Sequence, residues 1–142
     1  MADPRFAVAY DGLDAEYATF KIDDSTITYS ATATNGSAVV GRAVTLSAAN
    51  TVALAADGEA MIGKLISVKS DKVCRVQYEG YMTLPAGTGA SLTLGKKIVG
   101  CLLSSAKGYI REVATGTAAE LGVARGYIVD AGTTTAVVVN LE

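Results

Sequence analysis

The chain alternates short apolar runs with polar turns, and its clearest pattern lies at residues 73–79. There Cys74, Val76 and Tyr78 alternate with polar side chains. A period of two indicates a strand with one buried and one solvated face. Turn signals recur at a spacing of roughly 8–12 residues, which is typical of β-sandwiches and barrels. The pattern therefore predicts an all-β protein, either a compact β-sandwich or a barrel-like domain.

Individual strands are predicted wherever β-branched or apolar residues run between turn signals. The Asn35-Gly36 pair is favoured in tight hairpins, and Gly63, inside an apolar run, indicates a bulge or a close approach of two backbones. One helical turn is predicted at residues 117–121, with Gly122 as its stop. The predicted strands cover residues 25–32, 39–46, 51–54, 61–67, 73–79, 80–84, 97–103, 108–113, 126–130 and 133–141.

The first 24 residues differ from the rest of the chain. They mix acidic residues with four spaced aromatic residues, Phe6, Tyr10, Tyr17 and Phe20. Disordered segments are usually poor in aromatic residues, so an extended N-terminal arm at residues 1–24 is favoured over a disordered tail. Aromatic side chains often anchor interfaces. We expect these four and Arg5 to bind a partner, while residues 25–142 form a single β-domain.

The composition supports strands and close packing. Among the 142 residues are 24 Ala, 15 Val, 15 Thr and 15 Gly, but only two Phe and no Trp. Val and Thr suit a pleated sheet, and Gly supplies tight turns. The length fits one ordinary domain.

Charge and hydropathy argue against several classes of partner. The formal net charge is −2, with six acidic and two basic residues before position 31. Without a basic stripe, nucleic-acid binding is not expected. No stretch approaches the roughly 20 apolar residues of a membrane helix, so no membrane partner is expected either. Residues 1–4 lack the features of a signal peptide, which indicates synthesis in a cytoplasm.

The chemistry expected of an enzyme is missing from the composition. The chain has no histidine, so histidine-based nucleophile activation is excluded and a zinc site would need unusual ligands. Cys74 and Cys101 lie in strand-like runs, which favours buried free thiols; a disulfide remains the alternative. We therefore expect no enzyme activity, no cofactor and no resident metal.

Three motifs carry weaker alternatives. Residues 11–16 are acidic but lack the spacing of an EF-hand loop, so a solvated acidic face is favoured over calcium binding. Asp23 and Asp24 are adjacent, and adjacent strand residues point to opposite faces, so a turn or cap role is favoured over a carboxylate pair. The glycine-rich residues 87–89 lack the lysine of a phosphate-binding loop, which favours a hairpin loop.

The order of strands and glycines after residue 55 resembles that of a known family. The matching parts are Ala60–Leu65, Cys74–Met82, Pro85–Ala90, Ile98–Leu102 and Thr135–Leu141. In this pattern, which covers about 60% of the chain, residues 56–141 resemble the small capsid cement, or head decoration, proteins of tailed bacteriophages. Residues 1–55 match no pattern of that family.

The resemblance implies a β-tulip domain that sits on the outside of an expanded phage head. Its partners would be the major capsid protein and further copies of itself, arranged as a homotrimer over threefold positions. An N-terminal arm would reach across neighbouring capsid subunits. The protein would then be a structural component of the virion exterior, made in the host cytoplasm. Two alternatives remain: another virion β-module associated with a tail or fibre, and an enzyme or small-ligand binder.

Overall fold

A computed structural model describes residues 14–90, 92–114, 118–133 and 136–141. These residues form nine strands, a short α-helix and one 3-10 turn, so the prediction of an all-β protein is confirmed. No helix within the described ranges has the length and apolar character of a membrane span. The elements are β1 (Glu16–Ile22), η2 (Thr34–Gly36), β2 (Ala43–Ala48), β3 (Thr51–Leu54), β4 (Gly63–Val68), β5 (Val73–Leu84), β6 (Ile98–Leu103), β7 (Ala106–Glu112), α1 (Ala118–Val123), β8 (Tyr127–Thr133) and β9 (Ala136–Leu141).

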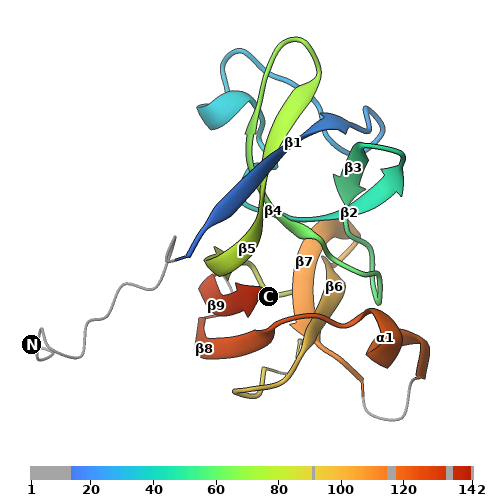
Figure 1. Cartoon of the computed structure of the whole chain (residues 1–142), viewed down its shortest axis with the longest axis vertical. Coiled ribbons are helices and arrows are strands. Elements are labelled where there is room, and N and C mark those ends of the chain that lie inside the picture. Colours follow the sequence, from blue (N-terminus) through green and yellow to red (C-terminus); the bar gives the residue numbers. More distant parts are fainter. Residues whose placement is uncertain (1–13, 91, 115–117, 134–135, 142) are drawn as a thin grey trace, which may run out of the picture.

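Five strands close into a barrel in the order β1-β3-β2-β4-β5, with β5 returning to β1 (Figure 1). β1 runs parallel to β3 and antiparallel to β5. The barrel interior is filled by branched aliphatic side chains, among them Val44, Val52, Leu65 and Val76, all fully buried. Closure removes most sheet edges, which would otherwise expose unpaired backbone groups.

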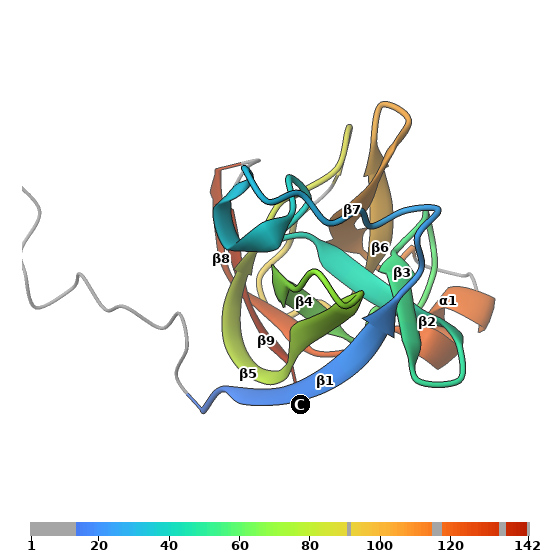
Figure 2. The same ribbon diagram turned by 90° about the horizontal axis from the view of Figure 1, so that it is seen from above.

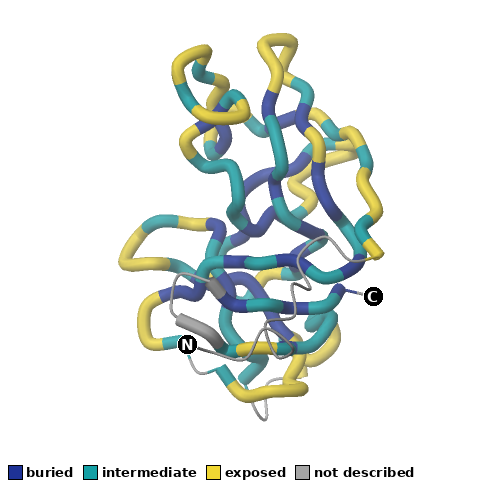
Figure 3. The backbone as a smooth tube through the Cα atoms, turned by 90° about the vertical axis from the view of Figure 1, so that its left-hand side faces the viewer, coloured by how far each residue is buried: buried dark blue, intermediate teal, exposed yellow. Residues whose placement is uncertain are grey.

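The long strand β5 belongs to two sheets. Its first half lies in the barrel, whereas Gly80–Leu84 pairs with β9, which in turn pairs with β8. The hairpin β6–β7 lies beside this second sheet, and a second core fills the space between them. Met82, Leu84, Ile98 and Ile110 are fully buried there. Figure 3 shows buried positions running through both parts of the chain.

A β-bulge at Tyr78 marks the point where β5 changes partners. Glu79 lies opposite Glu16 and Gln77 lies opposite Tyr17, so Tyr78 is an extra residue in the β1–β5 ladder. The strict alternation expected for residues 73–79 is therefore wrong at its end. Gln77, directly before the bulge, is buried and its side chain donates hydrogen bonds to the carbonyls of Glu79 and Tyr81, whereas Tyr78 in the bulge is only half-buried.

The close backbone approach predicted at Gly63 is confirmed. A Cβ at this position would lie 2.1 Å from the carbonyl oxygen of Gln77, on the neighbouring strand. This contact lets β4 pack tightly against β5 next to the bulge. A second irregularity follows on β4 between Leu65 and Ser67.

The strand predicted at residues 25–32 does not form. Asp23 instead starts a turn, because its side chain accepts hydrogen bonds from the backbone N–H (3.0 Å) and hydroxyl (2.6 Å) of Ser25. Its carbonyl accepts from the amides of Thr26 and Ile27. Ile27 is fully buried and anchors this segment on the barrel core. The turn role predicted for Asp23 is thus confirmed, while Asp24 forms an ion pair with Lys72 (2.8 Å).

The N-terminal arm predicted at residues 1–24 is wrong for its second half. Residues 16–22, assigned to an arm spanning residues 1–24, form the strand that closes the barrel. Ile22 is buried and Phe20 packs against the barrel core. An extended strand with alternating apolar residues gains more from pairing with β5 than from remaining free. Residues 1–13 lie outside the described residues.

Both cysteines are free and buried, as predicted. Burial raises the pKa of the Cys74 thiol to about 11, and burial also raises the pKa of Cys101. Cys101 packs against the glycine-rich loop, where a Cβ on Gly87 would lie 2.3 Å from its Sγ. Residues 87–89 thus form a loop, but the predicted hairpin is wrong, because the flanking strands β5 and β6 pair with other strands and not with each other.

Substituting Gly63→Ala is expected to lower the free energy of unfolding by about 1–3 kcal/mol or more, because the new methyl group meets backbone that cannot move aside. The control is Gly122→Ala in α1, where nothing outside the helix's own backbone and the adjacent residues lies within 4 Å of the new Cβ. That change should be neutral or stabilise by about 0.5–1 kcal/mol. Urea denaturation of both variants measures the difference. Equal free energies of unfolding for the two variants would contradict the close approach of Gly63 to the Gln77 backbone.

At pH 8 the native protein is expected to react negligibly with Ellman's reagent, because both thiols are buried and protonated. Two thiols per chain should react once guanidinium unfolds it. The native labelling rate should rise with pH as the thiolate form of Cys74 becomes populated toward pH 11. Rapid stoichiometric labelling of the folded protein at pH 8 would contradict this burial.

Candidate interaction surface

The structure separates the five residues predicted to bind a partner. Arg5, Phe6 and Tyr10 lie outside the described residues. Tyr17 and Phe20 both lie on β1 but differ in exposure: Tyr17 is 41% exposed, whereas Phe20 is half-buried against the barrel core. Of these two, Tyr17 is the one available to a partner.

Tyr17 lies on the outer face of three neighbouring strands, β4, β5 and β1. Across these strands Ser67, Arg75 and Thr19 share one row of the sheet, and Tyr17 lies in the next row. The Arg75 guanidinium stacks on the Tyr17 ring, 4.0 Å from its centroid. A cation–π contact at an exposed site contributes about 0.5–1 kcal/mol. Figure 2 shows β1 curving along the outside of the barrel from β5 toward β3.

The strand register places four cations on this face: Lys21, Lys64, Lys69 and Arg75. We call it the outer cationic face. Within the described part of the chain none of the four forms an ion pair. A hollow of about 170 Å³ opens beside two of them, Lys69 and Arg75, and is lined by Thr19, Ser67, Lys69, Val73, Cys74 and Arg75. Unpaired cations beside two hydroxyl groups suit a carboxylate or phosphate partner.

Most of this face was not predicted from the sequence. The alternation at residues 73–79 placed Arg75 on a solvated face, which is the one signal that could have found it. Ser67 and Lys69 join Arg75 only through the pairing of β4 with β5, and that pairing has no local signature in the sequence.

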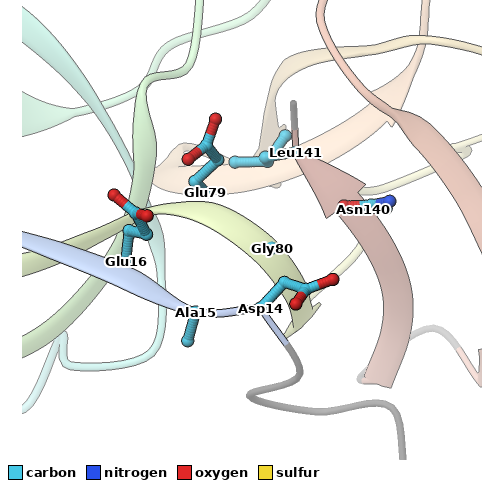
Figure 4. A pocket seen from close by; sticks show the side chains of 7 residues that line it. All are labelled: Asp14, Ala15, Glu16, Glu79, Gly80, Asn140 and Leu141. Atoms are coloured by element: carbon cyan, nitrogen blue, oxygen red, sulfur yellow. The ribbon is translucent and has the colours of Figure 1, made fainter.

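An acidic hollow of about 500 Å³ lies where β1 begins, next to the middle of β5 and the end of β9 (Figure 4). Its lining residues are Asp14, Ala15, Glu16, Glu79, Gly80, Asn140 and Leu141. The Tyr78 hydroxyl donates a hydrogen bond to Glu16 (2.8 Å), and this bond raises the pKa of Tyr78. Asp14 and Leu141, the first and last described residues, both line this hollow, so the two ends of the described chain lie close together.

The acidic hollow does not have the arrangement of a metal site. Among the described residues, no group of three or more Asp, Glu or Cys side chains is placed to hold an ion. Of the acidic segment 11–16 considered for calcium, residues 11–13 lie outside the described residues, and Asp14 and Glu16 line this hollow. The arrangement fits a solvated acidic surface next to the outer cationic face.

A third hollow, of about 530 Å³, contains Arg111, whose charge is already neutralised by two carboxylates. It is lined by Gly89, Lys96, Arg111, Glu112, Val113, Ala114 and Leu121. Arg111 donates hydrogen bonds to Asp57 (2.9 Å) and Glu120 (2.7 Å), and the bond from Arg111 lowers the pKa of Glu120. This network holds α1 against β7 and the turn after β3, so a structural role explains it.

Neither protein-family models, nor curated proteins, nor solved structures match this chain.

Proposed function

We propose that the protein is a capsid decoration protein that binds the outside of an expanded phage head and bridges neighbouring major capsid subunits. The supporting observation is the Tyr17–Arg75 stack at the centre of the outer cationic face. Residues 1–13, the first part of the segment predicted to bind a partner, join the fold at Asp14. β1 begins two residues later and carries Tyr17 on this face. The resemblance of residues 56–141 to head decoration proteins supports the same assignment.

The proposed mechanism is thermodynamic linkage. A protein that binds the expanded lattice but not its dissociated subunits stabilises the lattice by its binding free energy. Contacts to two subunits add avidity, because the second contact forms at a high effective concentration. Many copies, arranged as homotrimers over threefold positions, would reinforce the whole shell. No catalytic step is needed for this function.

Charge gives the partner surface a definite chemistry. The outer cationic face suits an acidic patch on the shell, whereas Asp3 and Asp11 in the preceding segment suit basic groups beside it. Complementary charges steer encounter and fix orientation. Because surface charges are screened over about 8 Å at physiological ionic strength, decoration should weaken as salt is raised.

Reversing the charge at the centre of the face is expected to weaken decoration. Arg75→Glu should lower affinity for expanded empty heads by about ten-fold or more, equivalent to about 1.4 kcal/mol, with little loss of thermal stability. The measurement is co-sedimentation with heads at low and physiological salt. The control is Lys97→Glu, an exposed cation directly before β6 in the second part of the fold. Equal binding by both variants would contradict the use of this face.

Deletion of residues 1–13 tests the arm without removing a strand. A deletion through residue 20 would also remove most of β1 and open the barrel. The chain starting at Asp14 keeps every described strand, so we expect an unchanged melting temperature together with loss of decoration. Thermal melting and head co-sedimentation measure the two effects. Unchanged affinity for heads would show that residues 1–13 play no part in binding.

A further inference from the structure

The first half of β1 has one unpaired edge. On the β5 side, the amide of Ile22 donates to the carbonyl of Lys72. On the opposite side, the amides of Lys21 and Asp23 donate to the carbonyls of Asn50 and Val52. Backbone groups alternate in direction along a strand, so the N–H and C=O groups of Tyr17 and Thr19 also point away from β5.

β3 covers this side of β1 only at its end. The two strands pair at Lys21 and Ile22, and β3 goes no further back along β1. Among the described strands β1 pairs only with β3 and β5, and on this side the described residues form no other backbone hydrogen bond with Tyr17 or Thr19. Both residues are exposed. An unpaired edge of this kind is a template for a further strand.

The unpaired edge borders the outer cationic face. Thr19 lies directly opposite Arg75 in the β1–β5 ladder, and Arg75 and Lys69 line the hollow beside them. Side chains on one face of a strand added at this edge would therefore lie next to Tyr17 and Thr19, with Lys21 on the diagonal. Arg75, which stacks on Tyr17 from the next strand, and Lys21 on the diagonal would favour acidic side chains on the added strand.

We propose that β1 accepts an extended acidic segment as an additional strand, with carboxylates at alternate positions facing the outer cationic face. Resting on the proposed function, this segment belongs to the major capsid protein. Backbone hydrogen bonds to Tyr17 and Thr19 provide affinity, and the cations select the acidic sequence. This division of roles is that of β-strand addition.

A peptide titration tests the site without heads. The probe is the peptide Ac-Thr-Glu-Val-Glu-Val-Thr-NH₂, and the control peptide carries Lys in place of Glu. In ¹⁵N NMR spectra of the full chain, the acidic peptide should shift the amide signals of Tyr17 and Thr19 and slow their hydrogen exchange. The basic peptide should do neither. Absence of these shifts, or equal shifts with both peptides, would overturn the proposal.

Proline substitutions separate strand addition from general charge attraction. Thr19→Pro removes an amide that points outward, a position where edge strands tolerate proline. It should leave the protein folded and weaken peptide binding by about five-fold or more, since one net hydrogen bond contributes about 1 kcal/mol. The matched control is Ala18→Pro, whose amide faces β5, and it should lower the melting temperature strongly. Full peptide binding by a folded Thr19→Pro variant would overturn the proposal.

Other occupants of the edge give different results. Peptide binding only after deletion of residues 1–13 would assign the edge to the chain's own first residues. Dimerisation that Thr19→Pro abolishes would assign it to a second copy. Either result overturns the proposal. Wild-type decoration of heads by Thr19→Pro would reject strand addition while leaving the proposed function intact, whereas peptide binding without any head binding would reject the proposed function alone.

Discussion

The fold depends on the change of partners along β5 at the Tyr78 bulge. A strand that leaves one sheet for another exposes carbonyl groups at the break, and a buried carbonyl without a partner costs about 1–3 kcal/mol. Gln77 donates hydrogen bonds to the carbonyls of Glu79 (3.2 Å) and Tyr81 (3.0 Å). Arg125 donates to those of Ile62 (2.8 Å) and Tyr78 (2.6 Å). These two side chains fasten the barrel to the second sheet.

The same break positions the surface that we propose for binding. Because β5 stays in the barrel only through Glu79, its first half lies between β4 and β1, and this sheet turns its outer face to solvent. Arg75 then meets Tyr17 from β1 and Ser67 from β4. The bulge also brings Glu79 opposite Glu16, which creates the acidic hollow at the end of the face. Cationic and acidic surfaces thus lie along one pair of strands.

Local signals in the sequence were sufficient for the fold class and for several elements. The expected bounds of residues 51–54 match β3, and the close approach at Gly63 was predicted from a glycine inside an apolar run. Residues 25–32 have strand-like composition but form turns, because Asp23 captures the backbone of Ser25 and the buried side chain of Ile27 holds the segment on the core. Tertiary packing there overrides β-propensity.

The candidate surface was less predictable, since it is built by pairing between distant residues. Tyr17 was identified from its aromatic character, but its position in a barrel strand was not, because closure of β1 on β5 joins residues about 60 apart in the chain. The unpaired edge at Tyr17 and Thr19 depends on where β3 begins relative to β1. That register joins residues 30 apart in the chain, such as Lys21 and Thr51, and cannot be inferred from β1 alone.

The most direct measurement of the proposed function is a cryo-electron microscopy reconstruction of expanded empty heads saturated with the protein. We expect many copies on the outer surface around threefold positions, with the β4–β5–β1 face against the shell and added density along the edge of β1. Bare shells, or protein confined to a tail or a single vertex, would contradict the proposed function.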